Sequence, residues 1–197
     1  MSKNEELLQR QDELQSEADE VSADLALEEA LARFGEPVRV GSAALGLMIH
    51  RDLDVTVVCP RLDAATLEAV AQLGARLAVL PNIRQVQFRD DTGRWNTDPA
   101  YPDGVYLGLR YRTQHGLEWN LDIWFVDEPD RQPDLDHVRT LPARLTSETR
   151  VAILGIKEAM AGSERVTRVR GYDVYRAVLD DGVRTPEEFE KWARARG

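Results

Sequence analysis

Residues 52–59 read Asp-Leu-Asp-Val-Thr-Val-Val-Cys, and this segment constrains the fold more than any other part of the chain. A valine-rich run with alternating polar residues is typical of a β-strand, and Pro60 ends it. A period of two places Asp52, Asp54 and Thr56 on one face and the intervening apolar residues on the other. The strand must therefore bury one face while the other presents two carboxylates whose Cβ atoms lie roughly 7 Å apart.

Two carboxylates at this distance repel each other. Such a pair is tolerated when water solvates it or when a divalent cation lies between the two side chains. Mg²⁺ prefers oxygen ligands and usually binds one or two protein carboxylates together with substrate phosphates. Asp52 and Asp54 therefore indicate either a solvated strand end or a cation site.

A third acid lies inside a later strand-like run, residues 117–126. Alternation places Trp119, Leu121, Ile123 and Phe125 on one apolar face and leaves Asp122 on the polar face. If this strand is a neighbour of the strand from Asp52, the three acids converge. The alternative is that Asp122 belongs to an exposed polar face.

Gly41-Ser42 precedes this region and suggests a phosphate contact. Glycine lets a phosphate approach the backbone closely, and Ser42 supplies a hydroxyl. We expect a short helix over residues 43–49 with Ser42 at its N-cap, so that unpaired N–H groups point toward a ligand. The alternative is that Ser42 only caps this helix.

The remaining patterns predict an α/β (α+β) fold, with a mixed, largely antiparallel sheet of about five strands flanked by helices, and a helical C-terminal part. We expect an antiparallel hairpin over residues 105–126, and loops at 90–104 and 127–142. The other expected strands cover 38–40 and 83–88, and the other expected helices cover 25–34 (capped by Ser22), 62–80, 148–161, 172–179 and a last one from 185. The chain then divides into an acidic helical arm (1–21), a main domain (22–142) and a C-terminal helical region (143–197).

Charge and composition exclude some classes of protein. The net charge is −10, but residues 1–30 hold ten acids against Lys3 and Arg10, so the arm carries most of it. No basic groove is evident, so nucleic acid is not an expected partner. Cys59 is the single cysteine, which excludes an internal disulfide, and we interpret it as a buried core thiol. The polar start and the lack of a long apolar run predict a cytoplasmic protein without a membrane segment.

Together these motifs resemble the nucleotidyltransferase superfamily of the DNA polymerase β type. The elements are Val40-Gly41-Ser42, nine intervening residues, Asp52-Leu53-Asp54-Val55 and the later Leu121-Asp122-Ile123. The match covers roughly residues 25–126 and is nearest to the small single-subunit branch that includes antibiotic and minimal nucleotidyltransferases. One departure concerns the segment after Ser42, which has no basic residue before His50 and Arg51, whereas many relatives place one there.

The resemblance implies an Mg²⁺-dependent (or Mn²⁺-dependent) enzyme that moves NMP from an NTP to a hydroxyl of a small molecule or protein and releases pyrophosphate. Asp52, Asp54 and Asp122 would hold metal, Asp122 alternatively serving as base, and Gly41 and Ser42 would bind the nucleotide. The alternative is a catalytically degenerate member of the fold that binds a nucleotide or a partner as a regulator. A third reading is an interaction protein that uses the acidic arm. The acceptor is not readable, and a homodimer is left open.

Several other residues have weaker patterns. Arg110 and Arg112 share one face of a strand and are interpreted as surface charges rather than phosphate ligands. Lys157 lies on the first C-terminal helix, where relatives sometimes place a nucleotide contact, but we interpret it as a solvated residue. Glu118 shares the face of Asp122. The three histidines, His50, His115 and His137, have no metal-ligand spacing.

Overall fold

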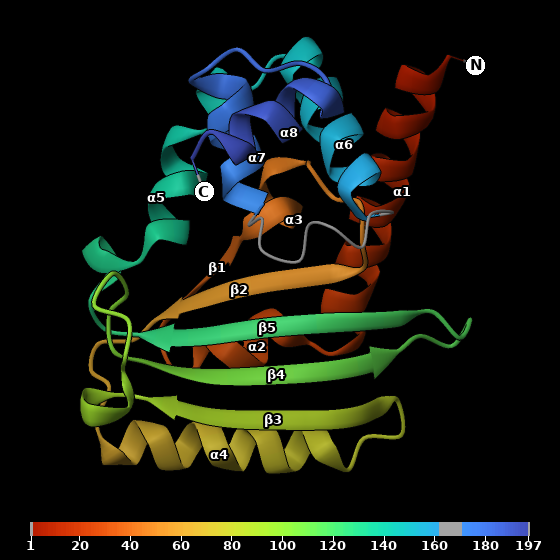
Figure 1. The fold of residues 1–197 in the computed structure, drawn as a ribbon. Helices are drawn as coiled ribbons and strands as arrows, with labels where there is room; N and C mark the ends of the chain where they lie inside the picture. The colour runs from red at the N-terminus through yellow and green to blue at the C-terminus, as the bar shows by residue number, and fades with distance from the viewer. Residues whose placement is uncertain (1, 162–170, 197) are drawn as a thin grey trace.

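The computed structural model describes residues 2–161 and 171–196, and Figure 1 shows their arrangement. The strands are β1 (Glu36–Val40), β2 (Asp52–Val58), β3 (Ile83–Asp91), β4 (Gly104–Arg112) and β5 (Glu118–Val126). The α-helices are α1 (Lys3–Asp24), α2 (Leu27–Ala32), α3 (Gly41–Leu45), α4 (Ala64–Ala78), α5 (Pro133–Thr140), α6 (Ser147–Ala161), α7 (Gly171–Leu179) and α8 (Pro186–Arg194).

The five strands form one sheet in the order β1-β2-β5-β4-β3. Strand β2 pairs with β5 in parallel, and the other three pairs are antiparallel. The prediction of a mixed, largely antiparallel sheet of about five strands is confirmed. The predicted hairpin corresponds to β4 and β5, whose register pairs Gly104 with Val126 and Arg112 with Glu118.

One face of the sheet carries the larger hydrophobic core. Strands β2, β4 and β5 each bury alternate apolar residues there, and Trp119 and Cys59 belong to this core as predicted. Helices α1, α2 and α4 cover the face, and Figure 1 shows α4 alongside β3. Helix α4 begins at the N-cap residue Asp63, whose side chain accepts a hydrogen bond from the backbone N–H of Thr66 (3.0 Å).

A second hydrophobic cluster holds the C-terminal helices together. It joins α6, α7 and α8 to the segment after α3 through residues such as Leu47, Ile153, Val178 and Phe189. Figure 1 shows these helices gathered beyond the β1–β2 edge of the sheet, with α5 beside them.

Helix α1 contributes to both clusters. Leu7 belongs to the C-terminal cluster, whereas Leu14, Ala18 and Val21 belong to the core of the sheet. Its acidic residues also form ion pairs with the body, including two hydrogen bonds from Arg51 to Glu17 (2.6 and 3.1 Å). The residues predicted as an acidic arm are therefore a packed helix, and that helix continues past the predicted boundary at residue 21.

Two predicted helix starts are wrong. Ser22 lies inside α1 instead of capping the next helix, because α1 stays helical while Ala18 and Val21 pack on the sheet. The helix expected over residues 43–49 is the shorter α3, whose N-cap is Val40 and which ends where Gly46 adopts a left-handed conformation (φ +66°). Ser42 therefore lies in the first turn of α3 and is not its cap.

The two predicted loops also contain regular structure. Strand β3 extends to Asp91, and residues 93–95 form a 3₁₀ turn, so the connection to β4 is shorter than expected. The segment 127–142 contains α5, which begins with Pro133 at its first position. Proline is compatible with the first turn of a helix because its missing N–H would have no intrahelical partner there, so proline content alone misled the prediction.

The C-terminal helices follow the predicted pattern, and α8 begins with the expected capping box between Thr185 and Glu188. Residues 162–170 and 197 of the predicted C-terminal region, and residue 1 of the predicted arm, lie outside the described residues. Within the described part, none of the helices is both long enough and apolar enough to cross a membrane.

Candidate active site

The three predicted acids lie together on adjacent parallel strands. Strand β2 and strand β5 are paired so that Asp54 is directly opposite Asp122, and Asp52 is opposite Asn120. Neighbouring strands are about 4.8 Å apart, and side chains at paired positions point to the same face. The structure therefore brings Asp52, Asp54 and Asp122 to one spot on the sheet, on the face opposite the main core.

Gly41 allows the segment after β1 to come close to these acids. It has a left-handed backbone (φ +63°), and a Cβ atom at this position would collide with the carboxylate of Asp54. Only glycine meets both requirements without strain. Gly41 and Ser42 therefore lie directly beside Asp54, in agreement with the predicted grouping.

Burial and mutual repulsion disfavour the charged forms of these acids. Burial, followed by the negative charges of Asp52 and Asp122, raises the pKa of Asp54 to about 7. Burial and the charge of Asp122 also raise the pKa of Asp52, although a hydrogen bond with Asn120 acts in the opposite direction. The cluster thus holds more negative charge than its surroundings compensate.

Lys157 of α6 is a cation that faces this cluster, and it is not the solvated residue that the sequence suggested. Its Nζ donates a hydrogen bond to the carbonyl oxygen of Leu47 (2.6 Å). Burial lowers its pKa to about 8, while the charges of Asp54 and Asp52 act to raise it. Lys157 supplies, from a distant helix, the positive charge that the segment after Ser42 lacks.

Tyr106 of β4 forms a hydrogen bond with the third acid, Asp122. Its hydroxyl donates a hydrogen bond to Oδ1 of Asp122, and burial together with this bond raises the pKa of Tyr106. Gly108 is paired with Asp122 across the two strands, and a Cβ atom at Gly108 would occupy the space of the Tyr106 hydroxyl. The glycine therefore lets the tyrosine reach across to the carboxylate.

Of three cavities that border Asp52 in the described part of the chain, two also border a second acid of the cluster. The first, of about 290 Å³, lies between the sheet and the C-terminal helices, and we call it the cleft. Its lining includes Gly41, Ser42, Asp52, Asp54, Asp134, His137, Lys157, Tyr172 and Tyr175. The second, of about 340 Å³, lies over the open face of the sheet, and we call it the sheet groove. Its lining includes Asp52, Asn120, Asp122, Tyr106, Arg110 and Gln87.

Of the remaining weaker candidates, His50 and His137 line the cleft, and the others are dispersed. Arg112 forms an exposed ion pair with Glu118, in agreement with the prediction of surface charge, while Arg110 borders the sheet groove. His115 lies in the exposed turn between β4 and β5. In the described part of the chain, no group of three or more His, Cys, Asp or Glu side chains is arranged so that it could hold a metal ion as it stands.

The sequence did not predict the positions of Tyr106 and Asp134, or that the rings of His137, Tyr172 and Tyr175 line the cleft. Tyr106 stands on the polar face of its strand, but only the register between β4 and β5 reveals its contact with Asp122. Asp134 and His137 lie on α5, which the sequence presented as a loop, and the ring of His137 stacks on Tyr172 (centroids 4.1 Å apart). No motif in these segments could have identified them.

No protein-family model matches the chain, and no curated protein matches it by sequence. Solved structures do match. Cid1 poly(U) polymerase in complex with ApU superposes with a TM-score of 0.58 at 16% identity, over 91% of this chain and 55% of that one. A cytoplasmic RNA terminal U-transferase matches with a TM-score of 0.53 at 18% identity, over 85% and 51%. The STING-associated c-di-GMP synthase CdnE from Capnocytophaga granulosa matches with a TM-score of 0.54 at 13% identity, over 85% and 59%.

The chain thus spans about half the length of these structural neighbours. Both Cid1 and CdnE are nucleotidyltransferase-fold proteins, and structures of Cid1 contain a UTP analogue or MgATP. At such low identities the likeness concerns the fold alone. The arrangement of its sheet and helices shows that this chain has the nucleotidyltransferase fold.

Proposed function

We propose that the protein is a divalent-cation-dependent nucleotidyltransferase that moves NMP from an NTP to a hydroxyl group and releases pyrophosphate. The observation that carries this proposal is the convergence of Asp52, Asp54 and Asp122 beside Gly41-Ser42, where the cleft and the sheet groove both reach Asp52. The cleft is the candidate site for the NTP, and the sheet groove is the candidate site for the acceptor.

The chemistry of the donor set fits Mg²⁺ or Mn²⁺. All three acidic ligands offer oxygen, which hard divalent cations prefer, and the raised pKa values of Asp52 and Asp54 indicate negative charge that a cation would compensate. A cation held by Asp52, Asp54 and Asp122 would neutralise the triphosphate and stabilise charge on the leaving pyrophosphate. Side-chain rotation on binding would complete the ligand set.

The protein's own residues would position the nucleotide. Gly41 permits a phosphate to approach the backbone, and the hydroxyl of Ser42 offers a hydrogen bond. Helix α3 has five residues, so its dipole contributes less than the sequence suggested. Lys157 would supply positive charge to the triphosphate from the opposite wall of the cleft.

The acceptor hydroxyl would enter from the sheet groove, where Asp122 and Tyr106 lie. In the alternative in which Asp122 serves as base instead of metal ligand, it would accept the proton as the hydroxyl oxygen attacks the α-phosphorus. The bond between the α-phosphorus and the bridging oxygen of pyrophosphate would break in the same step. The hydrogen bond from Tyr106 fixes the orientation of Asp122 in this step.

Calorimetric titration of the four NTPs, with and without Mg²⁺, tests the proposal. We expect one NTP to bind only with Mg²⁺, and Asp52→Asn/Asp54→Asn to abolish that binding. Asp130→Asn removes an exposed charge outside the cavities described above and serves as the matched control. Failure of folded wild type to bind any NTP with Mg²⁺ would contradict the proposal. If an NTP does bind, acceptors would then be screened by measuring the release of pyrophosphate.

Two observations favour a second candidate, a catalytically degenerate protein that binds a nucleotide or partner as a regulator. The side chains of the described residues do not form a ready metal site, and the segment after Ser42 has no basic residue before His50 and Arg51. In that case NTP binding would be independent of Mg²⁺ and would survive Asp52→Asn/Asp54→Asn. The same titration therefore distinguishes the two candidates.

A further inference from the structure

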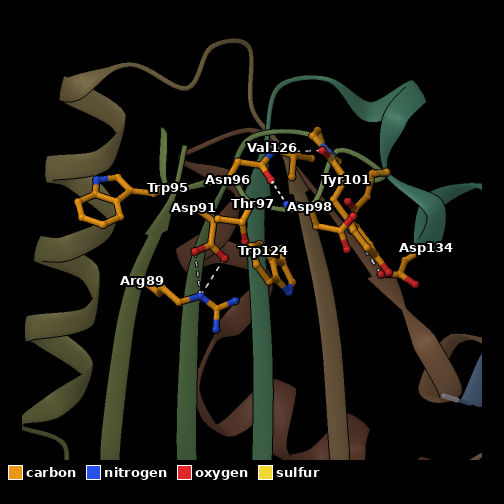
Figure 2. A pocket seen from close by; sticks show the side chains of 12 residues that line it. Arg89, Asp91, Trp95, Asn96, Thr97, Asp98, Tyr101, Trp124, Val126 and Asp134 are labelled. Carbon is orange, nitrogen blue, oxygen red and sulfur yellow. Dashed lines mark hydrogen bonds and ion pairs between the residues drawn. The ribbon is translucent and has the colours of Figure 1, made fainter. Parts of the chain in front are cut away.

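Another cavity, of about 550 Å³, lies beside the carboxyl end of β5 (Figure 2). We call it the aromatic cavity. Apart from Asp134, its lining differs from that of the cleft, and it has no residue in common with the sheet groove. Its volume is within the range of small-molecule sites in proteins. Its lining comprises Arg89, Asp91, Trp95, Asn96, Thr97, Asp98, Tyr101, Pro102, Trp124, Val126, Gln132 and Asp134.

The loop that forms one wall is held by its own hydrogen bonds. The amide of Asn96 donates to the carbonyl oxygen of Tyr101 (3.2 Å) and to Oδ1 of Asp103 (3.0 Å). Asp103 also accepts a hydrogen bond from the backbone N–H of Gly93 (2.8 Å). Arg131, from the following segment, donates to the carbonyl oxygen of Tyr101 (3.2 Å). The wall is thus formed before any ligand arrives, which lowers the entropic cost of binding.

Of the two tryptophans in the lining, Trp124 presents its ring to this cavity. Trp95 is 58% exposed, and its ring points away from the other lining side chains in Figure 2 and has the guanidinium of Arg94 4.9 Å from its centroid. The ring of Trp124 already interacts with a cation, because the guanidinium of Arg89 lies 5.3 Å from its centroid and 4.8 Å from that of Tyr106. Aromatic faces attract organic cations through their quadrupole.

The charge of the lining has the sign that suits such a ligand. Three carboxylates and one guanidinium line the cavity, and Arg89 pairs with Asp91 (2.8 Å). Asp98 accepts a hydrogen bond from the backbone N–H of Ala100 (3.1 Å), and among the described residues no Lys, Arg or His forms an ion pair with it. Asp134 lies 3.6 Å from Nδ1 of His137, which is a cation only when protonated. A phosphate or carboxylate ligand would be repelled here.

We infer that the aromatic cavity binds an organic cation, an ammonium or quaternary ammonium group attached to an apolar or aromatic body. The apolar body would lie against Trp124, and the cationic head would face Asp98 and Asp134. The site would be separate from the nucleotide cleft but would share the Asp134 wall with it.

Benzyltrimethylammonium is the probe for this inference, and benzyl alcohol is its neutral counterpart. Wild-type protein would be titrated without nucleotide or metal, at constant ionic strength, by calorimetry and by tryptophan fluorescence. We expect saturable binding of benzyltrimethylammonium with a Kd on the order of 1 mM. Benzyl alcohol should bind at least about fivefold more weakly, because it lacks the charge.

Two variants locate the probe. Asp98→Asn should weaken binding about threefold or more, and Trp124→Leu about two- to fivefold. Asp130→Asn, an equal change of charge outside the lining, should leave the Kd unchanged. Circular dichroism and urea unfolding would establish that each variant is folded.

Three results would overturn the inference: no saturable binding to wild type, equal binding of the neutral alcohol, or equal effects of Asp98→Asn and Asp130→Asn. The test is independent of the proposed enzymatic function. Asp52→Asn/Asp54→Asn should bind the probe as wild type does, whereas loss of binding in that variant would place the probe in the cleft and contradict the inference.

Discussion

The two faces of the β2–β5 pair differ in composition, burial and charge. On one face Leu53, Val55, Val57, Leu121, Ile123 and Phe125 are at most 6% exposed and pack in the main core. On the other face, residues one position along the same strands are the acids Asp52, Asp54 and Asp122. Stability therefore depends on one set of alternate residues and the proposed chemistry on the other, within the same two strands.

This difference has a physical origin in the connectivity. A parallel pair in the middle of a sheet is usually apolar on both faces, because helices cover both. Here the C-terminal helices approach the second face only partly, and the cleft and the sheet groove remain between them and the strands. Substitutions on the two faces should therefore have opposite effects on the free energy of unfolding.

The largest effect should come from the apolar face. Leu121→Ala removes a side chain that is 0% exposed and leaves a cavity between β5 and the covering helices. The free energy of unfolding should fall by about 2–5 kcal/mol, as measured by urea denaturation. NTP binding by the fraction that remains folded should be retained. Loss of NTP binding without loss of stability would contradict the separation of the two faces.

The next effect should have the opposite sign. Because the pKa of Asp54 is raised to about 7, the folded state binds this proton more tightly than the unfolded state, where the pKa is about 3.9. The free energy of unfolding should therefore fall as the pH rises from about 4 to about 7, and then level off. In EDTA at pH 8, Asp54→Asn should raise it by about 1–3 kcal/mol and flatten this pH dependence.

Urea denaturation across this pH range measures the effect, with Asp130→Asn as the control for a simple change of net charge. A loss of stability in Asp54→Asn would show that the carboxylate supports the fold and would remove the contrast between the faces. A gain of stability together with loss of Mg²⁺-dependent NTP binding would support the contrast between the two faces.

An intermediate effect is expected at Gly108. A methyl group there would displace the hydroxyl of Tyr106 and break its hydrogen bond to Asp122. The free energy of unfolding should fall by about 1–2 kcal/mol. Tyr106→Phe loses only the hydrogen bond, so it should lower the free energy of unfolding by less than Gly108→Ala does under the same conditions. If Gly108→Ala lost less stability than Tyr106→Phe, the hydroxyl of Tyr106 would not need the space over Gly108 to reach Asp122.

The smallest effect should occur at the far end of the polar face. Arg112 and Glu118 form an ion pair whose side chains are more than half exposed. Water and salt screen such pairs, so Arg112→Gln should leave the midpoint of the urea transition unchanged. If Arg112→Gln lowered the free energy of unfolding as much as Gly108→Ala does, this ion pair would contribute to stability and the prediction would be wrong.

Alternation in the sequence was sufficient to predict both faces of β2 and β5, since a period of two depends only on local geometry. That β2 and β5 are neighbours was not a local property, and only the resemblance to nucleotidyltransferases suggested it. The contact between Tyr106 and Asp122 depends on the register of β4 and β5, and the position of Lys157 depends on how α6 docks. Such long-range contacts carry no local pattern, so they appeared only in the structure.

Helix α1 has a mechanical consequence for the cleft. Its 22 residues form a rod about 33 Å long, fixed to the C-terminal cluster by Leu7 and to the core of the sheet by Leu14, Ala18 and Val21. The two walls of the cleft belong to the two bodies that this rod joins. Separation of the walls would therefore require α1 to release Leu7 or to twist, and would also break the hydrogen bonds from Arg150 and Lys157 of α6 to the carbonyl oxygens of Leu45 and Leu47.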